Sequence, residues 1–147
     1  MINIKVQLDP GAFMPTRAHD TDAGFDLYLK NDVMLNVGIY KLISTGVHLA
    51  IPVGWEGQIR PRSSSSIRYI DVAFGTIDAG YTGIVGIYAR YLPPDCHSLY
   101  STSLCLKKGE RIAQIVFKQV PNVSLELGNV TGLQTERGAN GFGSSGV

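Results

Sequence analysis

Residues 2–11 read INIKVQLDPG, and their pattern recurs throughout the chain. Ile2, Ile4, Val6 and Leu8 alternate with polar residues, so one face of an extended strand is apolar. The sequence Asp-Pro-Gly then marks a turn. This alternation predicts a short β-strand with one face toward a core.

Similar runs follow along the chain, separated by Gly, Pro, Asn and Asp turn signals. They read LYLKNDVML, IYKLIS, VHLAI, GQIRP, IVGIYARY, SLCLK and IAQIVFKQV. No segment has the period of an amphipathic helix, although one helical turn fits residues 64–68. Many short strands with regular turns predict an all-β sandwich, jelly roll or barrel.

Composition restricts the class of protein. The 147 residues are 44% hydrophobic and 17% charged, with a formal net charge of +1, which is typical of one globular domain. So balanced a charge predicts no general affinity for nucleic acid or membrane surfaces. We find no signal-peptide pattern and only two cysteines, so we expect a cytoplasmic protein, or one in the host cytoplasm if it is viral.

The strand pattern fades toward the C-terminus. We expect a core over residues 1–125 and an extended arm over residues 126–147, of a kind that small β domains often use to reach a neighbouring subunit. The arm ends RGANGFGSSGV, which carries a cation, an aromatic ring and two hydroxyls among glycines. Residues 92–103 are expected to form a protruding loop.

The segment TDAGFDLYL places Asp20, Asp22 and Asp26 near a glycine. Such residues often serve turn geometry. The functional alternative is a carboxylate beside a hydrated Mg²⁺, because hard cations prefer oxygen ligands.

The segment IRPRSSSSIR combines Arg60, Arg62 and Arg68 with four consecutive serines. A serine run can be a flexible loop. Hydroxyls and backbone N–H groups beside guanidinium groups would instead form a polyphosphate site.

The segment FGTIDAGYTGIVG is typical of a hairpin, in which Tyr81 would pack across the turn. The functional alternative makes Asp78 a general base on water and Tyr81 a platform for a sugar. Further along, Gln114 stands in the apolar run IAQIVF; either backbone satisfies its amide or it meets a phosphate.

Five segments in order resemble the motifs of the trimeric dUTP pyrophosphatases (dUTPases). They are Ala23 to Leu27, Pro61 to Ser63, Gly75 to Gly83, Gly109 to Gln114, and Arg137 to Gly146. The resemblance covers nearly the whole chain. It implies a jelly-roll subunit, a homotrimer with shared active sites, and hydrolysis of dUTP to dUMP and pyrophosphate with Mg²⁺.

The resemblance also implies roles for individual residues. Asp78 would activate the attacking water, Tyr81 would pack on the deoxyribose, and Mg²⁺ would sit near Asp26 through its water shell. The uracil edge would meet backbone groups at Gly75, Ile77 and Gly86. The phosphates would meet Arg62, Ser63, Ser64 and Gln114. The tail would add Arg137 on the γ-phosphate, Phe142 on the uracil, and Gly143, Ser144 and Ser145.

The chain departs from the family pattern at a few positions. Ser64 replaces the usual glycine, Thr82 a frequent arginine, and Ser145 the usual threonine, while the segment before the 75–83 motif looks one residue shorter. The 92–103 loop looks longer than usual. A protein partner there is one interpretation, and a plain surface loop is the favoured one.

Two rival functions stay open from the sequence. A dCTP deaminase, with or without triphosphate cleavage, has a similar fold and similar RSS and IDAGYTG segments. It needs a glutamate ten residues after Asp78, where Tyr88 stands. The second rival is a non-catalytic trimer that binds a nucleotide or a protein partner.

Overall fold

The computed structural model describes residues 2–94, 102–133, 135 and 138. Its elements are β1 (Lys5–Leu8), β2 (Gly24–Tyr28), β3 (Val33–Asn36), β4 (Lys41–Ala50), β5 (Trp55–Pro61), α1 (Ser63–Ile67), β6 (Ile70–Val72), β7 (Gly75–Ile77), β8 (Ile84–Tyr91), β9 (Ser103–Leu106) and β10 (Arg111–Gln119). The one helix among these residues falls where one helical turn was expected. The all-β prediction is therefore confirmed for the described residues.

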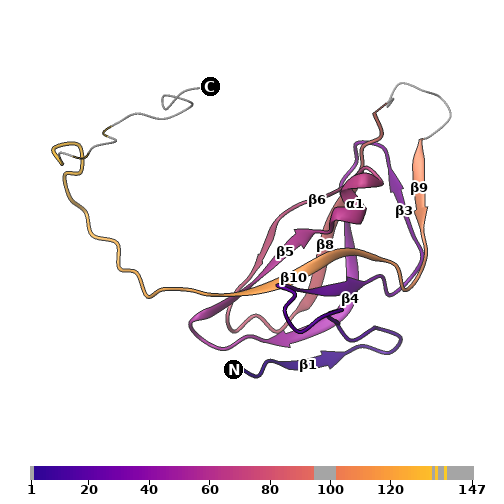
Figure 1. Ribbon diagram of the computed structural model, residues 1–147, viewed down its shortest axis with the longest axis horizontal. Coiled ribbons are helices and arrows are strands. Elements are labelled where there is room, and N and C mark those ends of the chain that lie inside the picture. Colours follow the sequence, from indigo (N-terminus) through magenta and orange to yellow (C-terminus); the bar gives the residue numbers. More distant parts are fainter. Residues whose placement is uncertain (1, 95–101, 134, 136–137, 139–147) are drawn as a thin grey trace.

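Two four-stranded antiparallel sheets carry the core (Figure 1). Their strand orders are β1-β4-β8-β6 and β2-β10-β5-β7, and a small β3-β9 sheet extends one end. Both large sheets send side chains into one cluster, in which Leu27, Ile59, Ile87 and Ile115 are almost fully buried. Burial of each such side chain stabilises the fold by about 1.5–3 kcal/mol. This arrangement is the jelly roll that the family resemblance implied.

The β4 strand joins two segments that the sequence pattern treated as separate runs. A bulge interrupts its pairing with β8 between Ser44 and His48. At this bulge Gly46 has a φ of +68°, which is favourable for glycine. The buried Thr45 hydroxyl donates to the Val85 carbonyl at 2.6 Å and accepts from the Val47 N–H at 3.1 Å, so the bulge leaves these groups bonded.

The expected hairpin over residues 74–86 is not a two-stranded ladder. Strand β7 pairs with β5, whereas β8 pairs with β4 and β6, so the turn between β7 and β8 crosses from one sheet to the other. The hairpin prediction was wrong because turn residues between two apolar runs do not specify which sheet each run joins. We call this connection the 78–83 turn.

Residue Tyr69 follows α1 with a φ of 57°, in the left-handed region. This conformation is costly for a residue with a Cβ atom. The Tyr69 N–H donates to the Ser66 carbonyl, and its carbonyl accepts from the Leu92 N–H. These two bonds hold the tight connection between α1 and β6.

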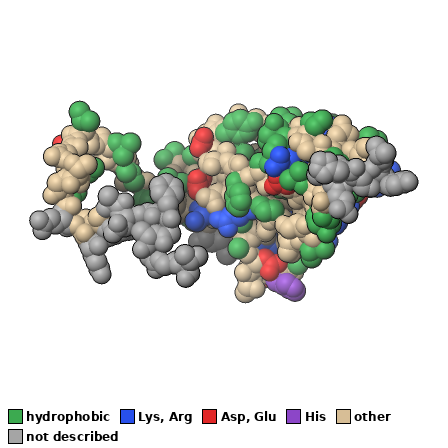
Figure 2. All heavy atoms as spheres, turned by 90° about the horizontal axis from the view of Figure 1, so that it is seen from above, with side chains coloured by type: hydrophobic (Ala, Val, Ile, Leu, Met, Phe, Trp, Pro, Cys, Tyr) green, Lys and Arg blue, Asp and Glu red, His purple; other side chains and the backbone are tan. Residues whose placement is uncertain are grey.

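Beyond β10, residues 121–133 contain no strand and are exposed. This segment runs away from the body of the molecule (Figure 1), and several apolar side chains lie along it (Figure 2). They include Val123, Leu125, Leu127, Val130 and Leu133. The boundary expected at residue 125 stays a prediction.

Candidate active site

A polar pocket of about 300 Å³ lies where β2, β10 and the start of α1 meet. Its lining is Arg17, Ala18, Asp22, Ala23, Gly24, Asp26, Arg62, Ser63, Arg111 and Gln114. Three of the five sequence motifs therefore meet at one place. The lining carries three arginines and two aspartates, which makes it suited to a ligand with several anionic groups.

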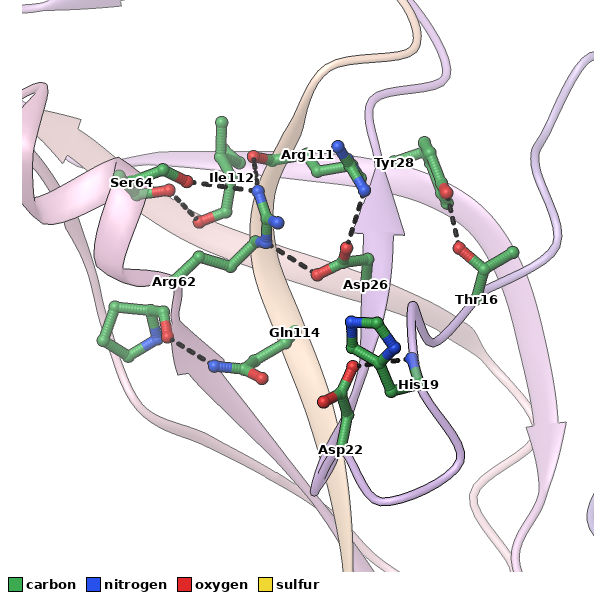
Figure 3. A network of polar contacts seen from close by, with 12 residues as sticks. Thr16, His19, Asp22, Asp26, Tyr28, Arg62, Ser64, Arg111, Ile112 and Gln114 are labelled. Carbon is green, nitrogen blue, oxygen red and sulfur yellow. Dashed lines mark hydrogen bonds and ion pairs between the residues drawn. The ribbon is translucent and has the colours of Figure 1, made fainter.

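The centre of this network is Asp26, whose carboxylate lies between two guanidinium groups (Figure 3). Arg62 Nε is 2.6 Å from Oδ1, and Arg111 Nη1 is 3.0 Å from Oδ2. Arg62 Nη1 also donates to Ser64 Oγ at 3.1 Å and to the Arg111 carbonyl at 3.2 Å. These contacts fix the Arg62 guanidinium at the pocket wall.

Strand register explains why these residues meet. Asp26 on β2 lies opposite Gln114 on β10, and Gln114 lies opposite Arg60 on β5. A register shift between Arg111 and Ala113 lets the Arg111 side chain reach Asp26. Bulges often redirect a side chain in this way.

The Gln114 amide is held by the backbone, as one of the two sequence interpretations expected. Its Nε2 donates to the Pro61 carbonyl at 3.0 Å. Gly24 leaves room for this arrangement, because a Cβ on Gly24 would overlap Gln114 Oε1 and displace the amide. Gln114 still lines the pocket, so a phosphate contact from its side chain stays a prediction.

The four serines of the run take different positions. Ser63 lines the pocket, and Ser64 Oγ accepts from Arg62 Nη1. Ser65 is buried and donates to the Ile112 carbonyl at 2.7 Å. The bond from Ser65 joins α1 to β10. The serine run is therefore part of a helix that is held against the sheet, and it is not a flexible loop.

Asp22 serves the turn that precedes β2. Its Oδ2 accepts the backbone N–H of His19 at 2.9 Å, and its own N–H donates to the His19 carbonyl at 3.0 Å. The turn interpretation therefore accounts for Asp22. Asp20 is exposed and does not line the pocket.

The 78–83 turn carries the expected base and sugar platform. The Tyr81 N–H donates to the Asp78 carbonyl at 3.2 Å, with Gly80 at a φ of +84°, as a type II turn requires. The Tyr81 hydroxyl donates to the Ile84 carbonyl at 3.1 Å. The Tyr81 ring lies over Gly83, where a Cβ would collide with it.

The residues expected at the uracil edge lie on the strands that flank this turn. Gly75 and Ile77 are on β7, opposite Ile59 and Gly57, and Gly86 is on β8. The space beside Gly86 is filled by the Leu42 side chain. A Cβ on Gly75 would make only ordinary contacts, so packing within the chain does not explain that glycine.

Within one chain the 78–83 turn and the polar pocket lie apart. Ile77 pairs with Gly57 near the start of β5, whereas Arg62 follows the end of β5. Five residues of strand at about 3.3 Å each separate these levels by roughly 15 Å. One subunit therefore does not bring Asp78 beside Arg62.

The remaining sequence-predicted residues lie outside the described part of the chain. They are Arg137, Phe142, Gly143, Ser144 and Ser145. Most of the 92–103 loop also lies outside it. The expectations for the tail and the loop stay predictions.

The carboxylate of Asp26 fits a water-mediated contact with a cation. Each of its oxygens accepts one bond from an arginine and keeps a further lone pair for a water ligand. The described residues contain no group of three His, Cys, Asp or Glu side chains that could form a metal cage. The site thus fits a hydrated cation that arrives with an anionic ligand.

The described chain is an all-β jelly roll whose arginine–aspartate pocket is suited to a small polyanion. The family model for dUTPase matches residues 11–146. The chain is 42% identical over 150 residues to the deoxyuridine 5'-triphosphate nucleotidohydrolase of Mycobacterium marinum, covering 96% of this chain and 92% of that protein. It is 38% identical over 151 residues to the corresponding Solibacter usitatus protein, covering 99% and 97%.

Solved structures agree with these relatives. A variant of the Staphylococcus bacteriophage 80alpha dUTPase with dUpNHpp matches with a TM-score of 0.91 and 31% identity, over 100% of both chains. This chain belongs to the dUTPase family.

Sequence reasoning missed three contributors to the pocket. Arg111, within the Gly109–Gln114 motif, and Arg17 both line the pocket, and no sequence pattern assigned them a role there. Gly24 was read as part of a motif, not as the residue that leaves room for Gln114. An arginine next to an apolar run was the available signal for Arg111, but the register shift that directs it was not readable from the pattern.

In the described residues no helix is long and apolar enough to cross a membrane.

Proposed function

We propose that this chain hydrolyses dUTP to dUMP and pyrophosphate. The observation that carries the proposal is the match of residues 11–146 to the dUTPase family, with three of its five motifs gathered at a polar pocket. The solved relative bound to dUpNHpp supports a nucleoside triphosphate as the ligand class.

The polar pocket would hold the phosphates. Arg62 is fixed by Asp26 and Ser64, so its charge is presented with little loss of side-chain freedom on binding. Ser63, Ser64 and Gln114 would add donors. Such preorganised donors stabilise the negative charge that spreads over the phosphate oxygens in the transition state.

Asp78 would act as the general base. The water oxygen forms a bond to the α-phosphorus, the bond from that phosphorus to the α–β bridging oxygen breaks, and the water proton passes to the Asp78 carboxylate. Pyrophosphate departs with the bridging oxygen. The exposed position of Asp78 on the turn leaves its carboxylate accessible to such a water.

The strands beside the turn would select the nucleoside. Backbone groups at Gly75, Ile77 and Gly86 have fixed positions and would read the uracil edge, since a cytosine amino group would meet a donor where an acceptor is needed. Tyr81 would pack on the deoxyribose and exclude a 2′-hydroxyl.

The tail residues Arg137, Phe142, Gly143, Ser144 and Ser145 would close over the ligand. Arg137 would meet the γ-phosphate and Phe142 would stack on the uracil. The glycines and serines would add backbone and hydroxyl contacts to the phosphates.

The Asp26 carboxylate would hold Mg²⁺ through its water shell. When bound to the triphosphate, Mg²⁺ supplies positive charge that offsets the negative charge on the phosphate oxygens. Asp26 keeps the Arg62 and Arg111 side chains in place beside it.

Within one chain the 78–83 turn and the polar pocket lie at opposite ends of β5. A homotrimer whose active sites are shared between subunits would bring them together. The 78–83 turn of one subunit would meet the polar pocket of a second, and the exposed 121–133 segment is suited to contact a neighbour. Mixing two inactive variants tests this arrangement. Asp78→Asn and Arg62→Ala subunits, unfolded and refolded together, should regain activity that neither shows alone, because some sites then combine two intact halves.

The decisive assay incubates the protein with each dNTP and Mg²⁺ and measures pyrophosphate and ammonia. Pyrophosphate from dUTP alone is expected, and Asp78→Asn should bind dUTP but lose most turnover. Ammonia from dCTP would establish the deaminase. In the structure Tyr88, at the position where deamination needs a glutamate, stacks on Tyr40 at 4.8 Å between ring centroids, which does not favour that activity. Silence with every nucleotide would favour the non-catalytic trimer.

A further inference from the structure

The imidazole of His48, on β4, contacts the 78–83 turn through one ring nitrogen and Asp9, which follows β1, through the other. Its Nδ1 is 2.9 Å from the Thr82 carbonyl oxygen, and its Nε2 is 3.2 Å from Asp9 Oδ1. The other Asp9 oxygen, Oδ2, accepts from Lys30 Nζ at 3.2 Å. The ring is thus placed between an anchored carboxylate and the backbone of the turn.

The bulge in β4 produces this placement. The Asp9 N–H donates to the Gly46 carbonyl at 2.8 Å. A Cβ on Gly46 would come within 2.9 Å of the Ala12 and Lys30 side chains, so glycine allows this close packing. Two residues later His48 lies opposite Ile84, the first residue of β8 after the turn.

We propose that His48 is a positioning residue for turnover, which holds the Thr82 carbonyl and thereby fixes the 78–83 turn that carries Asp78. The proposal rests on the proposed function, because it assumes that Asp78 is the base. Within the connection, Tyr81 donates from its N–H to the Asp78 carbonyl and from its hydroxyl to the Ile84 carbonyl. The bond from His48 adds a fixed point on β4, outside the connection.

The protonation state of His48 decides whether both bonds can form. A carbonyl and a carboxylate are both acceptors, so both contacts require N–H donors, which only the imidazolium has on both nitrogens. The Thr82 carbonyl and then Asp9 raise the pKa of His48, against partial burial and the nearby Lys30. Lys5 also lines the groove beside His48, at the β1 edge.

The direction of the pH effect follows. With a raised pKa, both bonds are present below the ordinary histidine range. As pH rises through the raised value the ring loses one proton, and the Thr82 carbonyl and Asp9 then compete for the single remaining N–H donor, which weakens the hold of His48 on the turn. One neutral hydrogen bond corresponds to about a 2- to 10-fold change in an equilibrium. We therefore expect the kcat for dUTP to fall by about that factor on the alkaline side, with KM little changed.

Two variants separate the bonds of His48. In His48→Asn the amide nitrogen can replace Nδ1 and donate to Thr82 without titrating. In His48→Gln the amide nitrogen replaces Nε2 and reaches Asp9 instead. His48→Asn should keep the wild-type kcat at pH 6 and lose the alkaline fall, whereas His48→Gln should have a kcat about 2- to 10-fold lower at pH 6. His48→Ala should behave like His48→Gln.

The matched control is His19→Asn, which should retain the alkaline fall. Thermal unfolding checks that each variant is folded. If His48→Asn and His48→Gln have equal kcat values at pH 6, or if both keep the alkaline fall, His48 does not position the turn.

A measurement without catalysis separates this inference from the proposed function. In Asp78→Asn protein, the NMR signals of the Thr82 and Gly83 amides should shift with the pH at which the His48 ring titrates. Unlinked titrations would overturn the positioning role even in an active enzyme. If the titrations are linked, the contact between His48 and the turn is supported. If the wild-type protein nevertheless releases no pyrophosphate from dUTP, the proposed hydrolysis is rejected while the contact stands.

Discussion

Asp26 on β2 and Arg62, which stands between β5 and α1, form an ion pair of 2.6 Å that spans β10, the strand between β2 and β5 in the sheet. The pair therefore fixes the junction of β5 and α1 against β2. Only 16% of the Asp26 side chain and 24% of the Arg62 side chain are exposed. Partial shielding from water makes this pair worth more than a surface ion pair.

Asp26→Asn should weaken both arginine contacts. We expect the free energy of unfolding to fall by about 1–2 kcal/mol, because charge-assisted hydrogen bonds are replaced by weaker ones. Urea denaturation measures this change. Asp20→Asn, at an exposed position, is the control and should be neutral; an equal loss in both variants would contradict the role given to Asp26.

Gly24→Ala should displace the Gln114 side chain, because the new methyl group occupies the position of its amide oxygen. Overpacking of this kind costs about 1–3 kcal/mol. The cost should be smaller when Gln114→Ala is also present, which a double-mutant cycle measures. If the stability changes of Gly24→Ala and Gln114→Ala are strictly additive, the Gln114 side chain is not the reason that glycine is favoured at position 24.

Two adjacent serines provide a matched comparison. Ser65→Ala removes a buried bond to the Ile112 carbonyl and should cost about 1–2 kcal/mol in stability. Ser66→Ala removes only an exposed 3.5 Å contact and should change stability by less than about 0.5 kcal/mol. Thermal unfolding of both variants measures the two losses of stability. Equal losses would contradict the structural role given to Ser65.

Tyr69→Gly should relieve the left-handed backbone strain after α1. Relief of about 1–2 kcal/mol is partly offset by the greater freedom of glycine in the unfolded chain, so we expect a net gain of roughly 0.5–1 kcal/mol. Tyr69→Ala keeps the strain and should give no gain. A loss of stability in the glycine variant would mean that the contacts of the tyrosine ring outweigh the strain.

Removal of residues 137–147 should leave the fold intact and abolish most dUTP turnover. The truncated protein loses the cation, the aromatic ring and the hydroxyls that the family resemblance assigns to the ligand. Circular dichroism and pyrophosphate release measure the two effects separately. Normal turnover by the truncated protein would refute a closing tail.

The sequence predicted most of the fold because alternation and turn residues are local signals. IVGIYARY coincides with β8, and the helical turn near Ser64 is present. What local signals did not provide was the pairing of strands. The partner of β7 and the bulge that directs Arg111 depend on contacts between distant segments, so neither was predicted.

For the candidate site, too, the sequence predicted residue types but not their positions in space. Residue types in ordered motifs identified Arg62, Ser63 and Gln114, and the structure gathers them at one pocket. The sequence did not reveal that Asp78 lies at the other end of β5, because motif order carries no distances. It also gave no reason to select His48, whose position depends on a bulge.

The 121–133 segment has a consequence for how the protein is made. Leu125 and Leu127 are almost fully exposed in the single chain, and such surface favours association. In the proposed homotrimer, a newly folded subunit would be an assembly intermediate. Its soluble yield would then depend on whether it meets another copy of itself before the 121–133 segment adheres to an unrelated chain.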